Sequence, residues 1–304
     1  HVIVIGAASI DMKGRPRKRL VPATSNPGRV KVSIGGVGRN IAENLVRLGV
    51  PTTLLSAVGN DAFASQVLET SARAGIDVSQ VLICRGDRTA TYLAILDEEG
   101  SLISAIDDMG IMSRVTPQYI YRRRRHIKGA AMMVLDANLQ PKAIRSAVNA
   151  AKRYNIPVCA DPTSTHLAPR LRKHLKDLFI ITPNVSEAEV LCGRKITNRF
   201  QPMDAAQELV SLGVKMAIIT LAEEGLCYAT SGESGRIPAI RCQVVDNTGA
   251  GDALSAAVVF GLLNDFPVDE AVRLGVSAAT LTLQCADTVC PDLSLERLYD
   301  QLVI

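Results

Sequence analysis

Residues 244–260 read "VVDNTGAGDALSAAVVF", a bare glycine turn that continues directly into small apolar residues. Gly249 and Gly251 stand on either side of Ala250, and Asp252 follows at once. A glycine turn that opens a helix directs backbone N–H groups and the positive end of the helix dipole at one point, which favours a phosphate group. Asp252 could take a proton from a hydroxyl in line with that phosphate, or it could only complement the dipole. The segment alone leaves these two interpretations even.

Strand-like and helical runs alternate along the chain on the N-terminal side of this segment. The chain opens with "HVIVIGAASID" (1–11), in which a continuous β-branched run ending in glycine is typical of a buried parallel strand, with Asp11 expected after that strand. After Met109 the alternation is regular, which implies right-handed crossovers onto a mainly parallel sheet. We therefore expect a single doubly wound α/β domain over residues 1–304, with helices flanking the sheet.

Two segments do not follow this alternation of strands and helices. Residues 12–34 end in the alternating run "GRVKVSI", and residues 86–108 hold two strand-like runs joined by residues 97–100, a hairpin signal. We expect these segments to form a small β-sheet that acts as a lid over the site. Small exposed sheets are marginal alone and need something to pack on, so the exposed face of this lid is the expected contact of a homodimer.

Composition excludes several classes of protein. Hydrophobic residues make up 47% of the chain and charged residues 21%, which is typical of a globular enzyme. The absence of Trp and the mild net charge of +4 argue against a nucleic-acid partner. The sequence has neither a run of 18 apolar residues nor a signal peptide, so no membrane partner is expected. Seven cysteines without a C-x-x-C pair indicate small buried residues in a reducing compartment, the cytoplasm by default.

The first residue, His1, already lies inside a strand-like run. A trimmed natural N-terminus is compatible with this start, and the sequence leaves the question open.

Two further motifs carry residues suited to chemistry. "GGVGRN" ends at Asn40, which suits a hydroxylated ligand, although a simple tight turn is the favoured interpretation. Ile41 stands where a dinucleotide-binding fingerprint needs its third glycine. "TPNVSEAEV" sets Asn184 three residues before Glu187, either as a capping box or as a pair that holds the water shell of Mg²⁺ beside ATP. The sequence contains no Walker pattern and no metal-ligand spacing of histidines.

Together these motifs resemble the PfkB family of carbohydrate and nucleoside kinases, which has the ribokinase-like fold. The N-terminal signature of the family is matched over residues 35–59. The C-terminal signature is matched by "NTGAGDALSAAVV", in which Asn247 replaces the usual small residue or Thr. The match covers essentially the full chain in the family's order. It implies an enzyme that transfers a phosphoryl group from ATP, with Mg²⁺, to an alcohol group of a small-molecule sugar or nucleoside.

The resemblance also implies roles for individual residues. Asp252 would be the catalytic base, and residues 249–251 the anion hole around the transferred phosphoryl group. The other implied residues are Asp11, Gly35, Gly36, Asn40 and Asn138 for the acceptor; Asn184, Glu187 (which would hold Mg²⁺ through water), Thr220 and Gly225 for the nucleotide; and Asp246 and Thr248, which match positions beside a monovalent cation, commonly K⁺, in some members. Ala222 replaces a glycine usual in the nucleotide loop, which puts the phosphate contact there in doubt.

The amino-acid sequence within and near the signatures is most similar to one branch of the family. "GVGRNIAEN" and "TATYLAILD" are most similar to members that phosphorylate pseudouridine, and the second run could offer Thr89, Thr91 or backbone groups to a base. Ribose, another nucleoside and a hexose such as fructose remain alternative acceptors. A catalytically silent binding or regulatory protein is an alternative of another class, which the intact Asp252, Asn184 and Glu187 disfavour. A nucleotide-dependent dehydrogenase is disfavoured by the missing third glycine.

Overall fold

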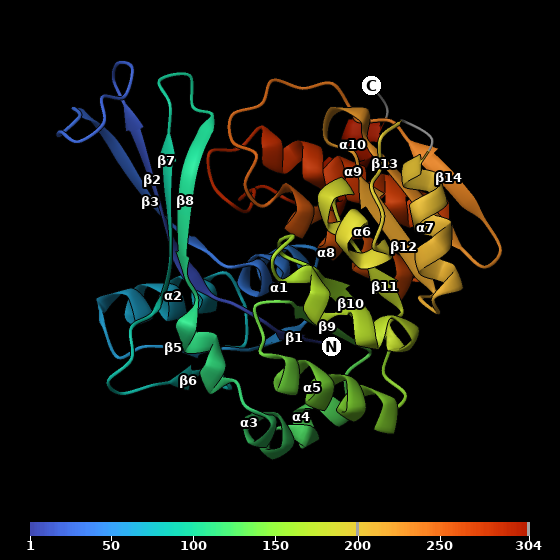
Figure 1. Ribbon diagram of the computed structural model, residues 1–304. Helices are drawn as coiled ribbons and strands as arrows, with labels where there is room; N and C mark the ends of the chain where they lie inside the picture. Colours follow the sequence, from blue (N-terminus) through green and yellow to red (C-terminus); the bar gives the residue numbers. More distant parts are fainter. Residues whose placement is uncertain (199–200, 303–304) are drawn as a thin grey trace.

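The computed structural model describes residues 1–198 and 201–302, and its centre is an eight-stranded sheet (Figure 1). Pairs from β12 to β4 are parallel, whereas β13 pairs antiparallel with β12 and β14. In spatial order the strands are β14 (Ser234–Ile237), β13 (Leu226–Thr230), β12 (Met216–Thr220), β11 (Ile180–Ile181), β10 (Val158–Asp161), β9 (Met132–Asp136), β1 (Val2–Ile5) and β4 (Thr52–Leu55). The predicted mainly parallel, doubly wound sheet is confirmed.

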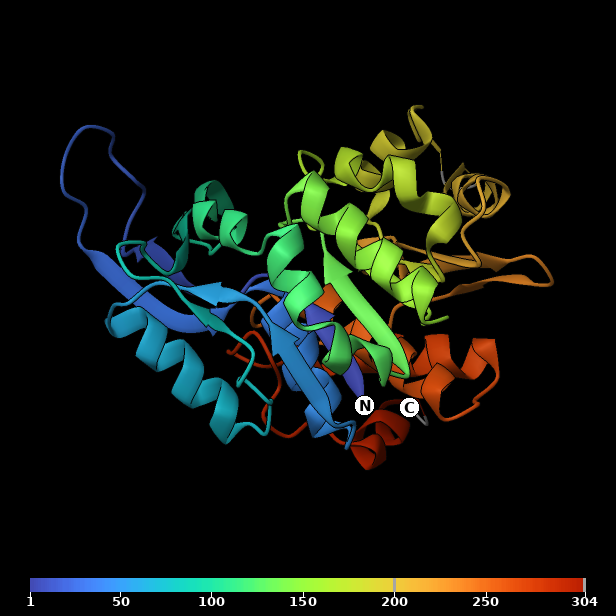
Figure 2. The ribbon, with the colours of Figure 1, turned by 90° about the horizontal axis from the view of Figure 1, so that it is seen from below.

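Helices cover both faces of this sheet, as Figure 2 shows for the green helices on one side and the orange-red helices on the other. The α-helices are α1 (Val37–Arg47), α2 (Ala62–Arg73), α3 (Pro117–Arg122), α4 (Arg124–Lys128), α5 (Pro141–Arg153), α6 (Val185–Cys192), α7 (Gln201–Ser211), α8 (Ala250–Leu263), α9 (Val268–Leu283) and α10 (Leu295–Leu302). Short 3₁₀ turns are η1 (Gly110–Arg114), η2 (Ala168–Arg170), η3 (Arg172–Asp177) and η4 (Ala222–Glu224).

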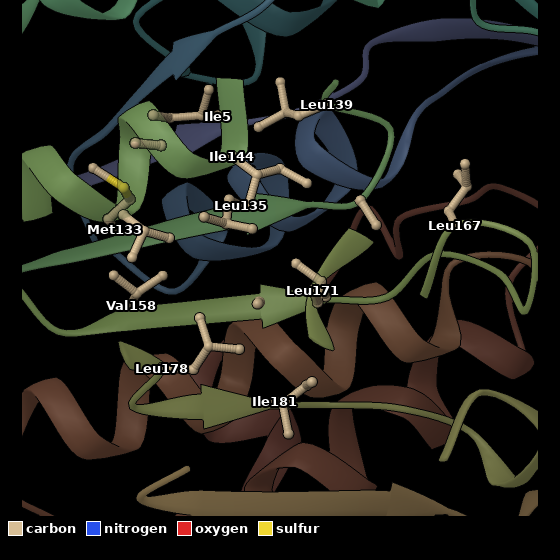
Figure 3. Close-up of a cluster of buried hydrophobic side chains, with 14 of the residues drawn as sticks. Ile5, Met133, Leu135, Leu139, Ile144, Val158, Leu167, Leu171, Leu178 and Ile181 are labelled. Carbon is tan, nitrogen blue, oxygen red and sulfur yellow. The ribbon is translucent and has the colours of Figure 1, made fainter. Parts of the chain in front are cut away.

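The parallel strands read as continuous apolar runs because each of their faces is buried. Ile3 and Ile5 of β1 belong to a cluster that includes α5, α6 and α7, part of which is drawn in Figure 3. Val2 and Val4 of the same strand join a second cluster with α1, α8 and α9. Burying each such side chain contributes about 1.5–3 kcal/mol, and the second cluster holds α8 against that face of the sheet.

A second sheet of four strands, hereafter the small sheet, stands away from the main one (Figure 1). Its strands in spatial order are β3 (Gly28–Gly35), β2 (Ser9–Pro16), β7 (Ala90–Leu96) and β8 (Leu102–Asp108). The strands β5 (Ala57–Val58) and β6 (Leu82–Ile83) form a separate parallel pair. The predicted hairpin is confirmed, because β7 and β8 pair antiparallel and the N–H of Asp97 donates to the carbonyl of Ser101 at 2.8 Å.

The opening buried parallel strand that ends at a glycine is confirmed as β1, but Asp11 does not simply follow it as expected. The structure divides this run, since β1 ends at Ile5 and β2 begins at Ser9 in the other sheet. Asp11 therefore lies inside a strand of the small sheet and does not follow a strand of the main one.

The two faces of the small sheet differ in chemistry, because in-register neighbours on adjacent strands point to the same side. One face carries the polar row Ser33, Asp11, Tyr92 and Asp107. The opposite face carries the apolar row Val32, Met12, Leu93 and Ile106. Ile106 is 68% exposed and Val30, on the same face, 71%.

The cysteines and the helices bear on two simpler expectations. Four cysteines are buried and three are half-buried, so the expectation of buried thiols holds for the majority. In the described ranges, none of the helices has the length and apolar character needed to cross a membrane.

Candidate active site

The glycine turn (residues 249–251) opens α8 as the sequence predicts. Gly249 is the residue before the helix and has a φ of 86°, a backbone conformation that residues other than glycine rarely adopt. A Cβ atom there would lie 1.9 Å from the carbonyl oxygen of Thr288. At Gly251 the same atom would meet only open space. The turn is thus packed tightly on one side and open on the other, where a ligand can approach its N–H groups.

Asp252 lies in the first turn of α8 and is buried. Its Oδ2 accepts a hydrogen bond of 2.8 Å from Nδ2 of Asn40, which comes from α1. Burial raises the pKa of Asp252 to about 7; the hydrogen bond from Asn40 opposes the rise, and the charges of Asp136 and Asp11 add to it. A carboxylate with such a pKa can accept a proton near neutral pH.

Asp136, at the end of β9, joins three segments around this carboxylate. It is fully buried, and its oxygens accept hydrogen bonds from the N–H groups of Ala7 (2.7 Å), Gly38 (2.9 Å) and Asn138 (2.9 Å). Burial raises its pKa as well, despite these bonds. The acceptor candidate Asn138 is thereby tied to the start of α1, although its side chain is not seen to contact Asp252.

Asp11, Gly35, Gly36 and Asn40 lie together on the side of Asp252 that faces the small sheet. Burial raises the pKa of Asp11, and the hydroxyl of Ser9 donates to it at 2.9 Å. A Cβ atom at Gly35 would lie 2.2 Å from Oδ2 of Asp11, so only glycine leaves room for this carboxylate. Gly36, with a φ of 95°, lets α1 begin against the backbone of Ala7.

On its other side the glycine turn borders a cavity of about 1000 Å³, within the size range of ligand pockets. Thr220, at the end of β12, and Gly225 line it together with Ala250 and Gly251 of α8. The apolar part of the wall includes Ile240, Leu254, Val276, Ala279 and Leu283. The nucleotide candidates Asn184, Thr220 and Gly225 therefore meet at one cavity, which borders the glycine turn, whereas Glu187 is not among its lining residues.

Asn184 and Glu187 form the capping box of α6. The N–H of Asn184 donates to Oε2 of Glu187, and the N–H of Glu187 donates to Oδ1 of Asn184, both at 2.9 Å. Asn184 also lines the cavity. Burial raises the pKa of Glu187, and its Oε1 atom lies outside the capping box. The two interpretations of this pair are thus compatible, because one oxygen caps the helix and the other is left for a hydrated cation.

The nucleotide loop shows why glycine is usual at position 222. Ala222 has a φ of 51°, a left-handed conformation that costs an L-residue about 1 kcal/mol relative to glycine. Its neighbour Gly225 has a φ of 92°, and a Cβ atom there would lie 2.1 Å from the carbonyl oxygen of Ile237. The loop keeps the glycine-type backbone although one glycine is replaced.

Asp246 and Thr248, expected beside a monovalent cation, both contact Lys13 of β2. Nζ of Lys13 donates to Oδ1 and Oδ2 of Asp246, at 2.7 and 2.6 Å, and to the hydroxyl of Thr248. A second cation at these oxygens would stand in contact with the ammonium group. The residues as arranged here do not fit a monovalent cation.

The structure places the two threonines that were expected, as an alternative to backbone groups, to contact a base. The hydroxyl of Thr89 donates to Asp61 at 2.6 Å, so it is already used in the protein. Thr91 is in register with Ile10 and therefore points to the face opposite Asp11. Tyr92, which the sequence did not single out, shares the face of Asp11.

Three further residues of the site escaped the sequence patterns. Arg39 is buried beside Asn40 and forms an ion pair with Glu43, one turn along α1. The i, i+4 spacing of the two charges, inside a helix that is otherwise buried, was the available signal. Thr288 and Lys13 carried no local signal, because each reaches its partner across more than 200 residues.

The raised pKa of Asp252 predicts an acid limb in the pH–rate profile. A base must be deprotonated to act, so kcat/KM is expected to fall about tenfold per pH unit below about pH 7 and to level off above it. An ordinary aspartate would stay active down to about pH 5. Initial rates between about pH 5.5 and 8.5 measure this, with circular dichroism to verify that the protein stays folded. A profile that is flat through this range would contradict the assignment.

Comparison with known proteins agrees with this geometry. Residues 1–293 match the model of the pfkB family carbohydrate kinases. The pseudouridine kinase of Escherichia coli (strain K12) is 35% identical over 296 residues, 97% of this chain and 94% of that protein. The structure of a putative sugar kinase from Clostridium perfringens is 33% identical with a TM-score of 0.85, covering 100% of this chain and 95% of that one. A ribokinase of Arabidopsis thaliana complexed with ribose and ATP shares the fold, with a TM-score of 0.86 at 22% identity over 100% of this chain and 98% of that one.

Proposed function

The chain belongs to the pfkB family of carbohydrate kinases, phosphotransferases with a hydroxyl acceptor, and from this we propose that it phosphorylates the 5′-hydroxyl of pseudouridine with MgATP. The observation that carries the proposal is the position of Asp252. This buried carboxylate lies between the cavity that borders the glycine turn and the acceptor side with Asp11 and Asn40.

The proposed chemistry is a direct transfer between two bound substrates. The acceptor hydroxyl attacks the terminal phosphorus of ATP while Asp252 takes the hydroxyl proton, and the bond from phosphorus to the oxygen of ADP breaks. The N–H groups of the glycine turn and the positive end of α8 stabilise charge on the transferred phosphoryl oxygens. Asn40 holds the carboxylate in place through its 2.8 Å hydrogen bond.

ATP is proposed for the cavity, and Mg²⁺ for the side of the cavity at Asn184, next to Glu187. When bound, Mg²⁺ neutralises phosphate charge. It keeps several waters and takes few protein ligands, which agrees with a single carboxylate oxygen outside the capping box. Thr220 and the 222–225 loop, which line the cavity, are the proposed contacts of the nucleotide.

A nucleoside acceptor is supported by the polar face of the small sheet. Asp11 is the proposed partner of the sugar hydroxyls, and the row it belongs to continues with Tyr92 and Asp107. An aromatic ring and a carboxylate beside the sugar suit a stacked base that carries N–H donors. Pseudouridine has one ring N–H more than uridine. A site that accepts from this group is left with an unpaired polar atom when uridine binds, at a cost of about 1–3 kcal/mol.

The test is a comparison of acceptors at equal low concentration with MgATP. Pseudouridine is expected to give the highest kcat/KM among pseudouridine, uridine, ribose and fructose, because ribose and fructose lack the base and its binding energy. Release of ADP is measured in each case. A higher kcat/KM for ribose or fructose would refute pseudouridine as the substrate but would not refute the kinase activity. No turnover of any sugar or nucleoside, with ATP still binding, would favour the silent binding protein instead.

The small sheet is proposed to act as a lid and, through its apolar face, to form a homodimer. Val30, Val32, Leu93 and Ile106 line this face, and an exposed apolar surface of this kind on an open sheet calls for a partner. The cytoplasm remains the proposed compartment, in keeping with seven free cysteines.

Charge on the apolar face tests the dimer. The double variant Val30→Lys, Ile106→Lys is expected to be a monomer, because four like charges would face each other across the contact. Light scattering after gel filtration gives the mass of the wild type and of the variant. The matched control is Lys18→Glu, outside the sheet, which should leave the dimer intact. A wild type that is monomeric at micromolar concentration would refute this contact.

A further inference from the structure

The side chain of Lys13 joins the small sheet to the segment that precedes the glycine turn. Its side chain is 11% exposed and that of Asp246 is 19% exposed. The three donors of the ammonium group have three acceptors here: the two oxygens of Asp246 and the hydroxyl of Thr248. Hydrogen bonds from Lys13 and Thr248 lower the pKa of Asp246 against the effect of burial, which raises it. Asp246 is therefore a carboxylate paired with a buried lysine.

This ion pair is continuous with the backbone of the glycine turn. The N–H of Thr248 donates to Oδ1 of Asp246 at 2.9 Å, which folds residues 246–248 into a short turn. Gly249 follows directly and is the residue before α8. A change in the position of Asp246 would move the N–H groups of residues 249–251, which are the proposed anion hole.

A second lysine of the small sheet contacts the loop of residues 286–288, on the other side of the glycine turn. Lys31 is the in-register partner of Lys13, and its Nζ contacts the carbonyl of Ala286 and the carboxylate of Asp287. The hydroxyl of Thr288 in that loop donates to the carbonyl of Ile34 at 2.8 Å. The small sheet is thus connected to both segments that flank the glycine turn, but the side chain of Lys31 is 41% exposed and its ion pair is of the weak surface kind.

We propose, on the basis of the kinase function above, that Lys13 is a positioning residue whose ammonium group takes the place of a monovalent cation. It holds residues 246–248 and through them the glycine turn, so phosphoryl transfer by this chain is independent of K⁺. Because Lys13 belongs to the small sheet, the glycine turn is in its active position only while this sheet is closed over the site.

The first experiment compares wild type in K⁺ and in a cation too large for the site. With pseudouridine and MgATP, kcat should differ by less than about twofold between KCl and tetramethylammonium chloride at about 100 mM. Stimulation of the wild type by K⁺ of about tenfold or more would overturn the proposal.

The second experiment removes the ammonium group in two ways. In tetramethylammonium, Lys13→Ala and Lys13→Met should each lose roughly tenfold to hundredfold in kcat with little change in the KM for ATP, since the glycine turn is displaced. K⁺ should restore Lys13→Ala, which leaves room for an ion beside Asp246, and should not restore Lys13→Met, whose side chain fills that room. Lys31→Ala is the matched control and should stay within about twofold of the wild type. Equal activity of all variants without K⁺, or loss in Lys13→Ala that K⁺ does not restore, would overturn the proposal.

A binding readout separates this inference from the proposed function. K⁺ should raise the melting temperature of Lys13→Ala and leave those of the wild type and Lys13→Met unchanged, because only an ion that binds the folded state stabilises it. This result is independent of the acceptor, so it stands or falls even if pseudouridine is not the substrate. A shift of the wild type equal to that of Lys13→Ala would count against the role of Lys13.

Discussion

Replacing Asp252 by Asn is expected to lower kcat by about a thousandfold or more while the protein stays folded and binds ATP. The amide has nearly the same shape, and its oxygen can still accept the hydrogen bond of Asn40. It cannot take the proton of the acceptor hydroxyl. The stability of the fold should not suffer, because burial already disfavours the charged form of this side chain, as its raised pKa shows. Steady-state rates and calorimetric titration with ATP measure the two properties separately.

Asp161→Asn is the matched control for this variant. Burial, together with the charges of Asp252 and Glu187, raises the pKa of Asp161 well above its usual range. An amide keeps the size of this carboxyl group and removes the charge that its surroundings disfavour, so kcat should stay within about tenfold of the wild type. Turnover of Asp252→Asn at the wild-type rate would show that another group accepts the proton.

Alanine at Gly249 is expected to abolish most activity and to destabilise the protein by about 2–4 kcal/mol. The left-handed φ of 86° disfavours alanine, and the new Cβ atom would lie 1.9 Å from a backbone oxygen of Thr288, which cannot rotate away. The loop that carries Thr288 and the glycine turn must then move apart. Thermal unfolding and kcat/KM with pseudouridine measure the two losses.

The matched variant Gly251→Ala should lose activity without losing stability. Its methyl group would meet no protein atom, and alanine is the better helix former in the first turn of α8. The methyl group would instead stand where the phosphoryl group is proposed to bind, so kcat/KM should fall about a hundredfold or more. Normal activity of Gly251→Ala would contradict the position of the anion hole, and normal stability of Gly249→Ala would contradict the contact with Thr288.

The sequence predicts the large sheet and the glycine turn because both depend on local pattern. Apolar runs of the right length mark the parallel strands, and two glycines before a small-residue helix mark the start of α8. The position of Asp11 was not predictable in the same way. Gly6 marks the end of the first strand, but the pattern after it does not reveal that the chain enters another sheet at Ser9, since both strands begin with buried residues.

Long-range polar contacts account for the other differences. Lys13 looks like an exposed residue at the start of a basic stretch, and only the folded chain brings it to Asp246, 233 residues away. The register of β7 decides which face Thr91 occupies, and Thr89, which precedes that strand, donates to Asp61; residue type alone predicts neither. Asn184 and Glu187 remain ambiguous from sequence for a different reason. One hydrogen-bonding geometry serves a helix cap and is also compatible with a nearby hydrated ion.

The order of the site along the chain has a consequence for engineering by recombination. The residues that line the nucleotide-sized cavity all fall between Asn184 and Leu283, whereas every acceptor candidate lies at or before Asn138. A chimaera joined between residues 139 and 183 would inherit its donor specificity from one parent and its acceptor specificity from the other. Among the pairs that cross that junction, Asn40 with Asp252, Lys13 with Asp246, and Ile34 with Thr288 would have to be transferred as matched sets.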